Sequence, residues 1–226
     1  MKKSLPFVVI AIVLMAAIAG GWVLLRSSRQ SIHSSNPTPD PALDVKGAEP
    51  PHIRGNLNAP VTLEEFGDFQ CPSCGAYYHE LKKIEAEYGD RLRVIFRENP
   101  LVPTHEHALL AAQAAEAAGL QGEDKFWAMH DKLYEDQTTW TQAKDLVPVF
   151  VDYGKQIGLN PDQFMKDLNG EKVAQRIFQD GKRSHALSIN STPSFFVNGN
   201  EAKDPQQWKP EGLRQMINDA LKAAGK

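Results

Sequence analysis

The sequence predicts an α/β fold in the order β-α-β, helical insertion, β-β-α, placed behind an N-terminal segment and a linker. Three observations support this order. Two strand-like segments flank a helix-like one, about 90 residues with helix-forming signals follow, and a strand, an Asn-Gly turn and a helix close the chain. Strands that alternate with helices in this way indicate a sheet covered by helices.

Residues 1–26 are predicted to be a signal-anchor or a signal peptide. The run from Leu5 to Leu25 contains no charged residue and follows Lys2 and Lys3. A membrane-spanning helix needs about 20 apolar residues, whereas a cleavable signal has an apolar core of about 7 to 15. Length therefore favours a retained anchor, with the domain on the periplasmic or extracytoplasmic side. The alternative is secretion after cleavage near Ala19, which ends an A-x-A pattern.

Residues 27–51 are predicted to form a Pro/Ser-rich linker, because they are polar, hold five prolines and show no periodic apolar pattern. The remaining residues, 52–226, suit one domain of ordinary size. The formal net charge is −3 with both signs interspersed, which indicates no nucleic-acid partner.

The first part of the domain has the pattern of a βαβ unit. Residues 61–66 are rich in residues that favour a strand. A helix with one apolar face is expected to follow and to end at Gly89. Its apolar positions are Tyr77, Leu81, Ile84 and Tyr88. Residues 91–97 alternate apolar with mostly basic side chains and predict the second strand, reached by a right-handed crossover.

Residues from about 100 to 190 are predicted to form a helical insertion, since they are too many for a structureless loop. One helix start is sharp, because Asn160 is a good N-cap and Pro161 suits the first helical position. After the insertion, residues 194–197 predict a strand, Asn198-Gly199 a hairpin turn, and residues 213–221 a terminal helix.

The only two cysteines lie in one motif, Cys71-Pro72-Ser73-Cys74. An exported protein that used disulfides for stability would carry several scattered pairs, and a loop this short constrains the unfolded chain very little. A reactive role explains the two cysteines better than a stabilising disulfide does. Cys71 lies at the predicted helix start, where unpaired N–H groups and peptide dipoles favour a thiolate. Cys74 lies one turn further and can resolve a mixed disulfide.

Three segments together resemble the DsbA-like branch of the thioredoxin superfamily. They are residues 59–74, which read APVTLEEFGDFQCPSC, then Gln121-Gly122 with Phe126-Trp127, and residues 191–199, which read STPSFFVNG. The resemblance covers roughly residues 55–221. It implies a thioredoxin-like fold with a helical insertion and a protein thiol-disulfide oxidoreductase that acts on exported proteins. It also implies a membrane redox partner that reoxidises or reduces the cysteine pair, and no cofactor.

The resemblance gives Glu65 the role of a buried acid that transfers a proton to and from Cys74. Strand alternation places Glu65 on the face of Val61 and Leu63, and Glu64 on the opposite face. Without the resemblance, a solvated strand acid would be the preferred interpretation, because glutamate is seldom fully buried. Asp68 lies in the same segment, but an acid of a turn or helix start explains it equally well.

The resemblance also implies that Thr192-Pro193 is the loop that carries a cis-proline against the cysteines. Pro193 would leave the backbone of Thr192 free to pair with an extended substrate. The pair is therefore a predicted substrate-binding site. By the sequence alone, an ordinary proline at a strand start is the preferred interpretation, because few X-Pro bonds are cis, and the resemblance decides against it. Pro72 and Ser73, between the cysteines, are expected to tune the redox potential.

Several other residues are not assigned a function. His105-Glu106-His107 suggests metal ligands, but histidines two residues apart on a helix point in different directions, and no third ligand follows. We therefore predict no metal site. Ordinary helix positions explain the remaining candidates, His79, His130 and His185. Phe126 and Trp127 are interpreted as core residues before any role in a peptide groove.

The direction of electron flow stays open. A dithiol oxidase that introduces disulfides is favoured, because an exported dithiol meets an oxidising compartment. A reductase or an isomerase of the same fold is the alternative. Strongly oxidising family members have Pro-His between the two cysteines, whereas this chain has Pro72-Ser73. An isomerase would need a dimerisation module, for which the linker is too short, so a monomer is expected.

Two hypotheses from other classes remain. A copper or zinc carrier could use the paired thiolates, although copper-delivery relatives space their cysteines by three and add a histidine. A thiol-based chaperone that holds clients without turnover would act without either cysteine.

Overall fold

The computed structural model describes residues 44–226. The predicted signal-anchor or signal peptide and residues 27–43 of the predicted linker lie outside this part of the chain. Between residues 44 and 226, no helix is both long and apolar enough to cross a membrane. The anchor, its cleavage alternative and the domain boundaries therefore stay predictions.

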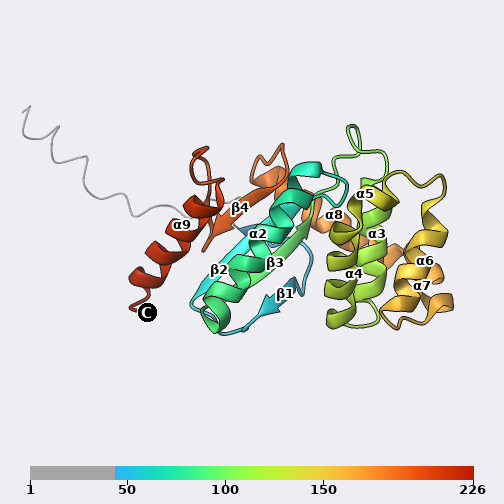
Figure 1. Cartoon of the computed structure of the whole chain (residues 1–226), viewed down its shortest axis with the longest axis horizontal. Helices are drawn as coiled ribbons and strands as arrows, with labels where there is room; N and C mark the ends of the chain where they lie inside the picture. The colour runs from blue at the N-terminus through green and yellow to red at the C-terminus, as the bar shows by residue number, and fades with distance from the viewer. Residues whose placement is uncertain (1–43) are drawn as a thin grey trace, which may run out of the picture. The chain divides into compact units, whose positions relative to one another are not determined.

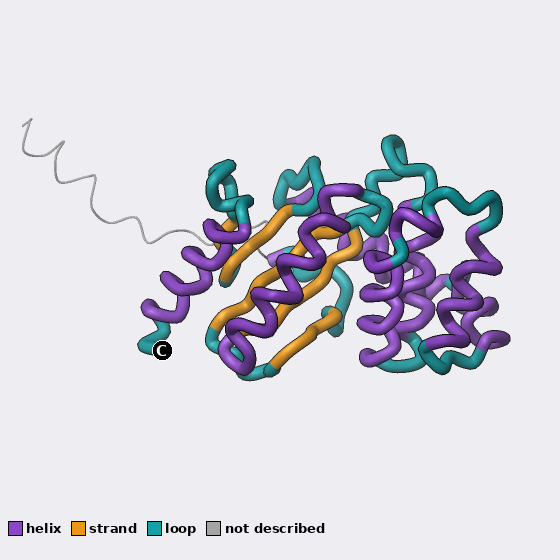
Figure 2. The backbone as a smooth tube through the Cα atoms, in the orientation of Figure 1, coloured by secondary structure: helices purple, strands orange, loops and turns teal. Residues whose placement is uncertain are grey.

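Within residues 44–226 the sheet has five strands, in the order β1-β3-β2-β4-β5. They are β1 (His52–Gly55), β2 (Val61–Gly67), β3 (Leu92–Glu98), β4 (Ser194–Val197) and β5 (Asn200–Glu201). β2 and β3 run parallel, and the other pairs are antiparallel. Figure 2 shows the strands in orange among the purple helices. The predicted βαβ unit and the later hairpin are thus confirmed.

Helix α2 (Pro72–Tyr88) joins β2 to β3 through the 3-10 turn η2 (Gly89–Arg91), and α9 (Pro210–Ala223) ends the fold. Gly89 ends α2 with a φ of 51°, which glycine adopts without strain. The side-chain hydroxyl of Tyr88 donates to the carbonyl oxygen of Arg214, so α2 and α9 lie together on one face of the sheet (Figure 1).

The predicted helical insertion is present between β3 and β4. It comprises α3 (Ala108–Gly119), α4 (Glu123–Glu135), α5 (Gln137–Trp140), α6 (Leu146–Gln156), α7 (Pro161–Leu168) and α8 (Glu171–Ala186). Asn160 caps α7 as expected, because its side chain accepts from the backbone N–H of Gln163 at 2.9 Å. Helices α3 to α7 gather beside the sheet in Figure 1, and α8 returns to pack on β3. This return brings the chain back to β4.

The sequence did not reveal how residues 44–55 join the domain. β1 pairs with β3, with His52 opposite Phe96. Ahead of β1, Ala48 is 1% exposed, its N–H donates to Asp180 at 2.7 Å, and its carbonyl oxygen accepts from Arg97 at 2.7 Å. The last residues of the predicted linker therefore pack on the folded unit. A four-residue strand is too short to show a period, which is why β1 was not predicted.

Candidate active site

Three chain segments meet at one edge of the sheet. Because β2 and β3 are parallel, Cys71 after β2 and the loop after Glu98 leave the sheet on the same side. β4 is antiparallel to β2, so Thr192 and Pro193, just before it, lie at that edge too. The Cys71 thiol donates to the carbonyl oxygen of Thr192 at 3.4 Å, which joins the first and third segments.

Cys71 is the N-cap residue of α2, at the helix start as predicted, and Pro72 occupies the first helical turn, where its missing N–H costs no hydrogen bond. The Cys71 N–H donates to the carbonyl oxygen of Asp68 at 3.1 Å. Cys71 is 6% exposed and Cys74 is 0% exposed, and both are free thiols. Both cysteines are thus buried, and Cys71 is the more exposed of the two.

The surroundings displace the two thiol pKa values in opposite directions. The pKa of Cys71 is lowered to about 5, and the largest cause is a hydrogen bond from the Cys74 side chain. The Thr192 side chain and the backbone N–H groups of Cys74 and Ser73 lower it further, whereas burial raises it. Burial is the first cause that raises the pKa of Cys74 well above its ordinary value, followed by its hydrogen bond to Cys71 and the charge of Glu65. A thiolate therefore forms first at Cys71.

Glu65 is 3% exposed, on the face of β2 that carries Val61 and Leu63, as the alternation predicted. Burial raises the pKa of its carboxyl group from 4.5 to about 8, and the negative charges of Glu85 and Cys71 add to the rise, while Arg54 opposes it. The charge of Glu65 contributes to the raised pKa of Cys74, so the carboxyl group lies near the buried thiol.

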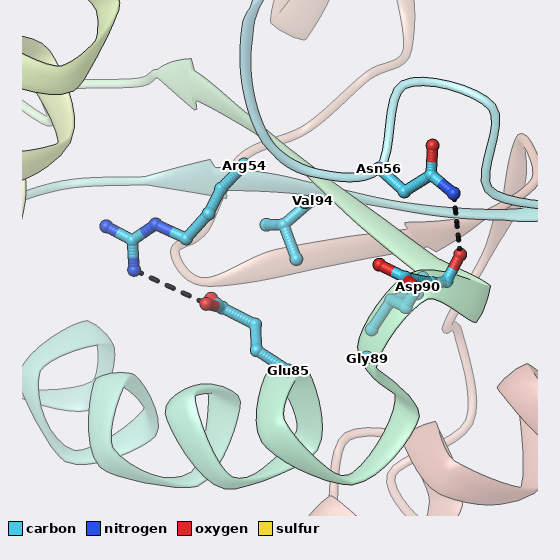
Figure 3. Close-up of a pocket in the computed structure, with 8 residues that line it drawn as sticks. Arg54, Asn56, Glu85, Gly89, Asp90 and Val94 are labelled. Atoms are coloured by element: carbon cyan, nitrogen blue, oxygen red, sulfur yellow. Dashed lines mark hydrogen bonds and ion pairs between the residues drawn. The ribbon is translucent and has the colours of Figure 1, made fainter.

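Sequence analysis missed the two charged residues that act on Glu65. Arg54 of β1 and Glu85 of α2 line a pocket of about 520 Å³ (Figure 3). Their side chains are 3.4 Å apart, and the guanidinium group also contacts Asp131 at 2.5 Å and lies over the ring of Trp127. No local signal marks Arg54, because its position depends on the unpredicted pairing of β1 with β3.

The helical insertion contributes Gln137 to the site. Its side-chain amide, at the start of α5, donates to the carbonyl oxygens of Phe69 at 2.7 Å and Cys71 at 2.9 Å. Gly75 leaves room for this contact, because a Cβ there would clash with the Gln137 side chain. Gln137 thus fixes the turn before α2 from outside the sheet, and a single glutamine gives no sequence signal.

The Thr192–Pro193 peptide bond is cis. The Thr192 hydroxyl group is buried and acts on the Cys71 thiol, whose pKa it lowers. The backbone N–H of Thr192 donates to no backbone group between residues 44 and 226. Among the described residues, the Thr192 N–H therefore lies free beside Cys71.

A family model described as Thioredoxin (Thioredoxin_4) matches residues 48–219, nearly the whole described part. The chain belongs to this thioredoxin family. Among solved structures, BdbD from Bacillus subtilis is 28% identical with a TM-score of 0.67, over 76% of this chain and 93% of that one. A thioredoxin-like oxidoreductase from Silicibacter pomeroyi DSS-3 is 26% identical with a TM-score of 0.62, over 75% and 91%.

α-DsbA1 from Wolbachia pipientis, at 18% identity and a TM-score of 0.65 over 81% of this chain and 99% of that one, shares the fold. These findings confirm the DsbA-like assignment within the thioredoxin family, and with it the enzyme class, protein thiol-disulfide oxidoreductase. The roles of individual residues stay predictions.

The curated relatives are longer proteins. The Na(+)/H(+) antiporter NhaA 1 of Mycolicibacterium gilvum is 34% identical over 193 residues, which cover 84% of this chain and 30% of the antiporter. The same antiporter of Mycolicibacterium vanbaalenii is 34% identical over 195 residues, with the same coverage. This thioredoxin-family chain thus spans about 30% of the length of these antiporters, and ion transport is not carried over to it.

The aromatic and histidine side chains to which the sequence assigned no function lie in the core or pair with neighbouring acids. Phe126 and Trp127 are buried, so the core interpretation is confirmed. His130 is buried among aromatic rings, and burial lowers its pKa to about 4. His105 contacts Asp68, whereas His107 contacts Glu106, so the two histidines do not converge. Between residues 44 and 226, no group of three or more His, Cys, Asp or Glu side chains could hold a metal ion.

Proposed function

We propose that this chain is a dithiol oxidase that introduces disulfides into exported proteins through Cys71 and Cys74. The observation that carries the proposal is the opposite displacement of the two thiol pKa values, to about 5 for Cys71 and upward for Cys74. A stabilised Cys71 thiolate stabilises the reduced form of the enzyme. Such a couple is a strong oxidant, because reduction ends in that favourable state.

The reaction begins with the Cys71–Cys74 disulfide. A client thiolate attacks the Cys71 sulfur, a mixed disulfide forms, and Cys74 leaves as a thiolate that takes the proton of Glu65. A second client thiolate then attacks the client sulfur of the mixed disulfide, and Cys71 leaves as a thiolate. The client loses two electrons, and the enzyme gains them as its reduced dithiol.

Glu65 has the properties this cycle requires. With a pKa of about 8, its carboxyl group holds a proton near neutral pH and can still give it up. In the reverse step it receives the Cys74 proton, so the buried thiol can become a nucleophile. Pro72 and Ser73 tune the couple through the helix start, where the Ser73 N–H helps to lower the pKa of Cys71.

The client chain binds in an extended form at Thr192 and Pro193. The free N–H of Thr192 supports this part of the proposal, since main-chain pairing recognises a backbone irrespective of its sequence. The cycle closes when a membrane redox partner reoxidises the cysteine pair. No cofactor and no nucleic acid take part, and the protein acts as a monomer in the extracytoplasmic compartment.

The reduction potential of the Cys71–Cys74 couple tests the direction of electron flow. We expect a reduction potential of about −120 mV when the full chain is equilibrated with glutathione buffers and its thiols are trapped with acid. A value near about −270 mV would instead indicate a reductase. The alternative of a metal carrier predicts stoichiometric binding of Cu(I) by the reduced protein, together with slow disulfide exchange.

A further inference from the structure

The polar groups of Cys71 are held by partners from different parts of the chain. Its N–H donates to the carbonyl oxygen of Asp68 at 3.1 Å, and its thiol donates to the carbonyl oxygen of Thr192 at 3.4 Å. Its own carbonyl oxygen accepts from the Gly75 N–H at 3.1 Å and from the Gln137 side-chain amide at 2.9 Å. Of these hydrogen bonds, only that of Gln137 comes from a side chain, so it is the one that a substitution can remove.

The amide of Gln137 also donates to the carbonyl oxygen of Phe69 at 2.7 Å. One planar NH2 group therefore bridges the two carbonyl oxygens on either side of Gln70 and uses both of its hydrogens. Phe69 is buried, and its ring stacks on that of Phe96 in β3. The bridge thus fixes the main chain of Cys71 relative to a packed part of the core.

The helical insertion holds Gln137 in place. Trp140, the last residue of α5, is fully buried, and its indole N–H donates to the carbonyl oxygen of Leu133 at 2.7 Å. Its ring packs edge-on against Phe150 of α6. The carbonyl oxygen of Gln137 accepts from the hydroxyl group of Thr141 at 2.7 Å. Since the backbone of α5 is already ordered, the amide reaches the redox turn at the cost of side-chain freedom alone.

Gly75 leaves the space that Gln137 occupies. A glycine inside a helix is less favourable than alanine, and Gly75 does not have the positive φ that would require it. A Cβ at this position would lie 2.9 Å from Cδ and 3.0 Å from Nε2 of Gln137, and closer still to its Oε1. These are the three nearest atoms outside the helix backbone, so the glutamine explains the glycine.

We propose that Gln137 is a positioning residue of the exchange reaction, which holds Cys71 at the start of α2 with its sulfur toward Thr192, and that residue 75 is glycine to admit it. The inference rests on the proposed attack by Cys71. A rotation of the Cys71 peptide would move the sulfur away from the helix start, which favours the thiolate, and from the loop where we place the client chain. Gln137 acts through the main chain of Cys71.

The test measures attack by Cys71. Reduced full-length protein is mixed with oxidised glutathione at several pH values, quenched with acid at intervals and analysed by mass. The Cys71 thiolate attacks one sulfur of the probe, a bond from Cys71 to glutathione forms, and the second glutathione leaves as a thiolate that takes a proton from water. The Cys71 sulfur is oxidised and the departing glutathione is reduced. Disappearance of the fully reduced mass therefore gives the rate of attack and its pH midpoint.

Gln137→Met is expected to slow attack by about tenfold and to raise its pH midpoint, because methionine fills a similar space without a donor. Gly75→Ala should have the same effect, since the added methyl group displaces the flexible end of the Gln137 side chain. Thr138→Ala is the matched control. Its side chain is exposed on the same short helix, so the rate and the midpoint should stay at the wild-type values.

A double variant separates this role from a general effect on folding. In the Gln137→Ala background the added methyl group meets no glutamine, so Gly75→Ala should not slow attack further and should raise the urea midpoint, as alanine does inside a helix. In the wild-type background the same change should slow attack by about tenfold. A direct effect of the methyl group on Cys71 would instead slow attack equally in both backgrounds.

The proposal is overturned if Gln137→Met attacks at the wild-type rate and pH midpoint, or if Gly75→Ala slows attack equally in both backgrounds. Should the Gln137 variants not fold, Gly75→Ala decides the matter, because it keeps the glutamine, and a wild-type rate of attack in this variant would overturn the proposal. A wild-type protein that forms no bond with glutathione would refute the proposed function itself, which is a different result from any of these.

Discussion

Glu64 and Glu65 are neighbours in β2, yet they lie on opposite faces of the sheet and in different electrostatic surroundings. Glu64 accepts from Arg97 Nε at 2.8 Å, and from Nε and Nη2 of Arg183 at 2.9 and 2.7 Å. Glu65 is equally buried, but within residues 44–226 its carboxyl group takes part in no salt bridge and no hydrogen bond. One strand thus carries a paired and an unpaired buried acid.

The difference shows how a fold separates a structural acid from a reactive one. Two arginines hold the Glu64 side chain in place, and these ion pairs join β3 and α8 to β2. Glu65 lacks such a partner, so burial dominates and raises its pKa to about 8, where it exchanges protons near neutral pH. The acid to which we assign the proton transfer is the one near Cys74. Replacement of the two residues should therefore affect different properties.

The largest effect is expected at the cysteines on the face of Glu65. Cys71→Ser should abolish exchange and leave no mixed disulfide, because a serine hydroxyl is scarcely ionised near neutral pH. Cys74→Ser should accumulate client proteins in covalent complexes, since Cys71 can still attack a client disulfide and no second thiol resolves the product. Diagonal gels after acid trapping read both outcomes. Trapping by Cys71→Ser alone would reverse the assignment of attacker and resolver.

Glu65→Gln should slow exchange by about a hundredfold near neutral pH, because the proton donor and acceptor of Cys74 is lost while both thiols remain. It should also remove a dependence of stability on pH. The wild-type acid is ionised above about 4.5 when unfolded but only above about 8 when folded, so the wild-type protein loses stability as pH rises through this window, by up to roughly 5 kcal/mol.

Urea unfolding of the reduced proteins between pH 4 and 9 measures this effect as the difference between wild type and Glu65→Gln. The difference should grow in favour of the variant up to about pH 8 and then stay constant. Parallel stability curves would show that Glu65 titrates normally and is not the proton carrier.

Glu64→Gln should act on stability instead. The substitution leaves Arg183 with an uncompensated buried charge, whereas Arg97 keeps its ion pair with Asp180, and this costs about 3–5 kcal/mol. The exchange rate of the folded fraction should stay near that of the wild type. Chemical unfolding and stopped-flow exchange on the same sample check both statements, and a variant that is stable but inactive would remove the distinction between the two faces.

The sequence predicted the face and the role of Glu65, but it did not predict the partners of Glu64. Alternation in residues 61–66 placed Glu65 on the face of Leu63, and the family resemblance gave it a role. The partners of Glu64 lie 33 and 119 residues away, and no local pattern reports such distant contacts.

The same limit explains what else was missed at the site. Arg54 acts on Glu65 only because β1 pairs with β3, and a strand of four residues carries no usable period. Asp68 and His105 lie 37 residues apart and meet where two parallel strands end together. Motifs read along the chain identify the cysteines, whereas the charges that tune them are brought there by tertiary structure.

The smallest effect is expected from Glu85, which acts on Glu65 through its charge alone. Its negative charge raises the Glu65 pKa and Arg54 lowers it, so Glu85→Gln should leave the arginine less neutralised and bring that pKa below about 8, by up to about one unit. The pH midpoint of the exchange rate, or a carbon NMR titration of the Glu65 carboxyl group, measures the shift. Glu87→Gln is the control, because its side chain is exposed on the same helix and pairs with Arg214. An unchanged midpoint in Glu85→Gln would show that burial alone sets the Glu65 pKa and that the Arg54 pocket has no part in the comparison of the two acids.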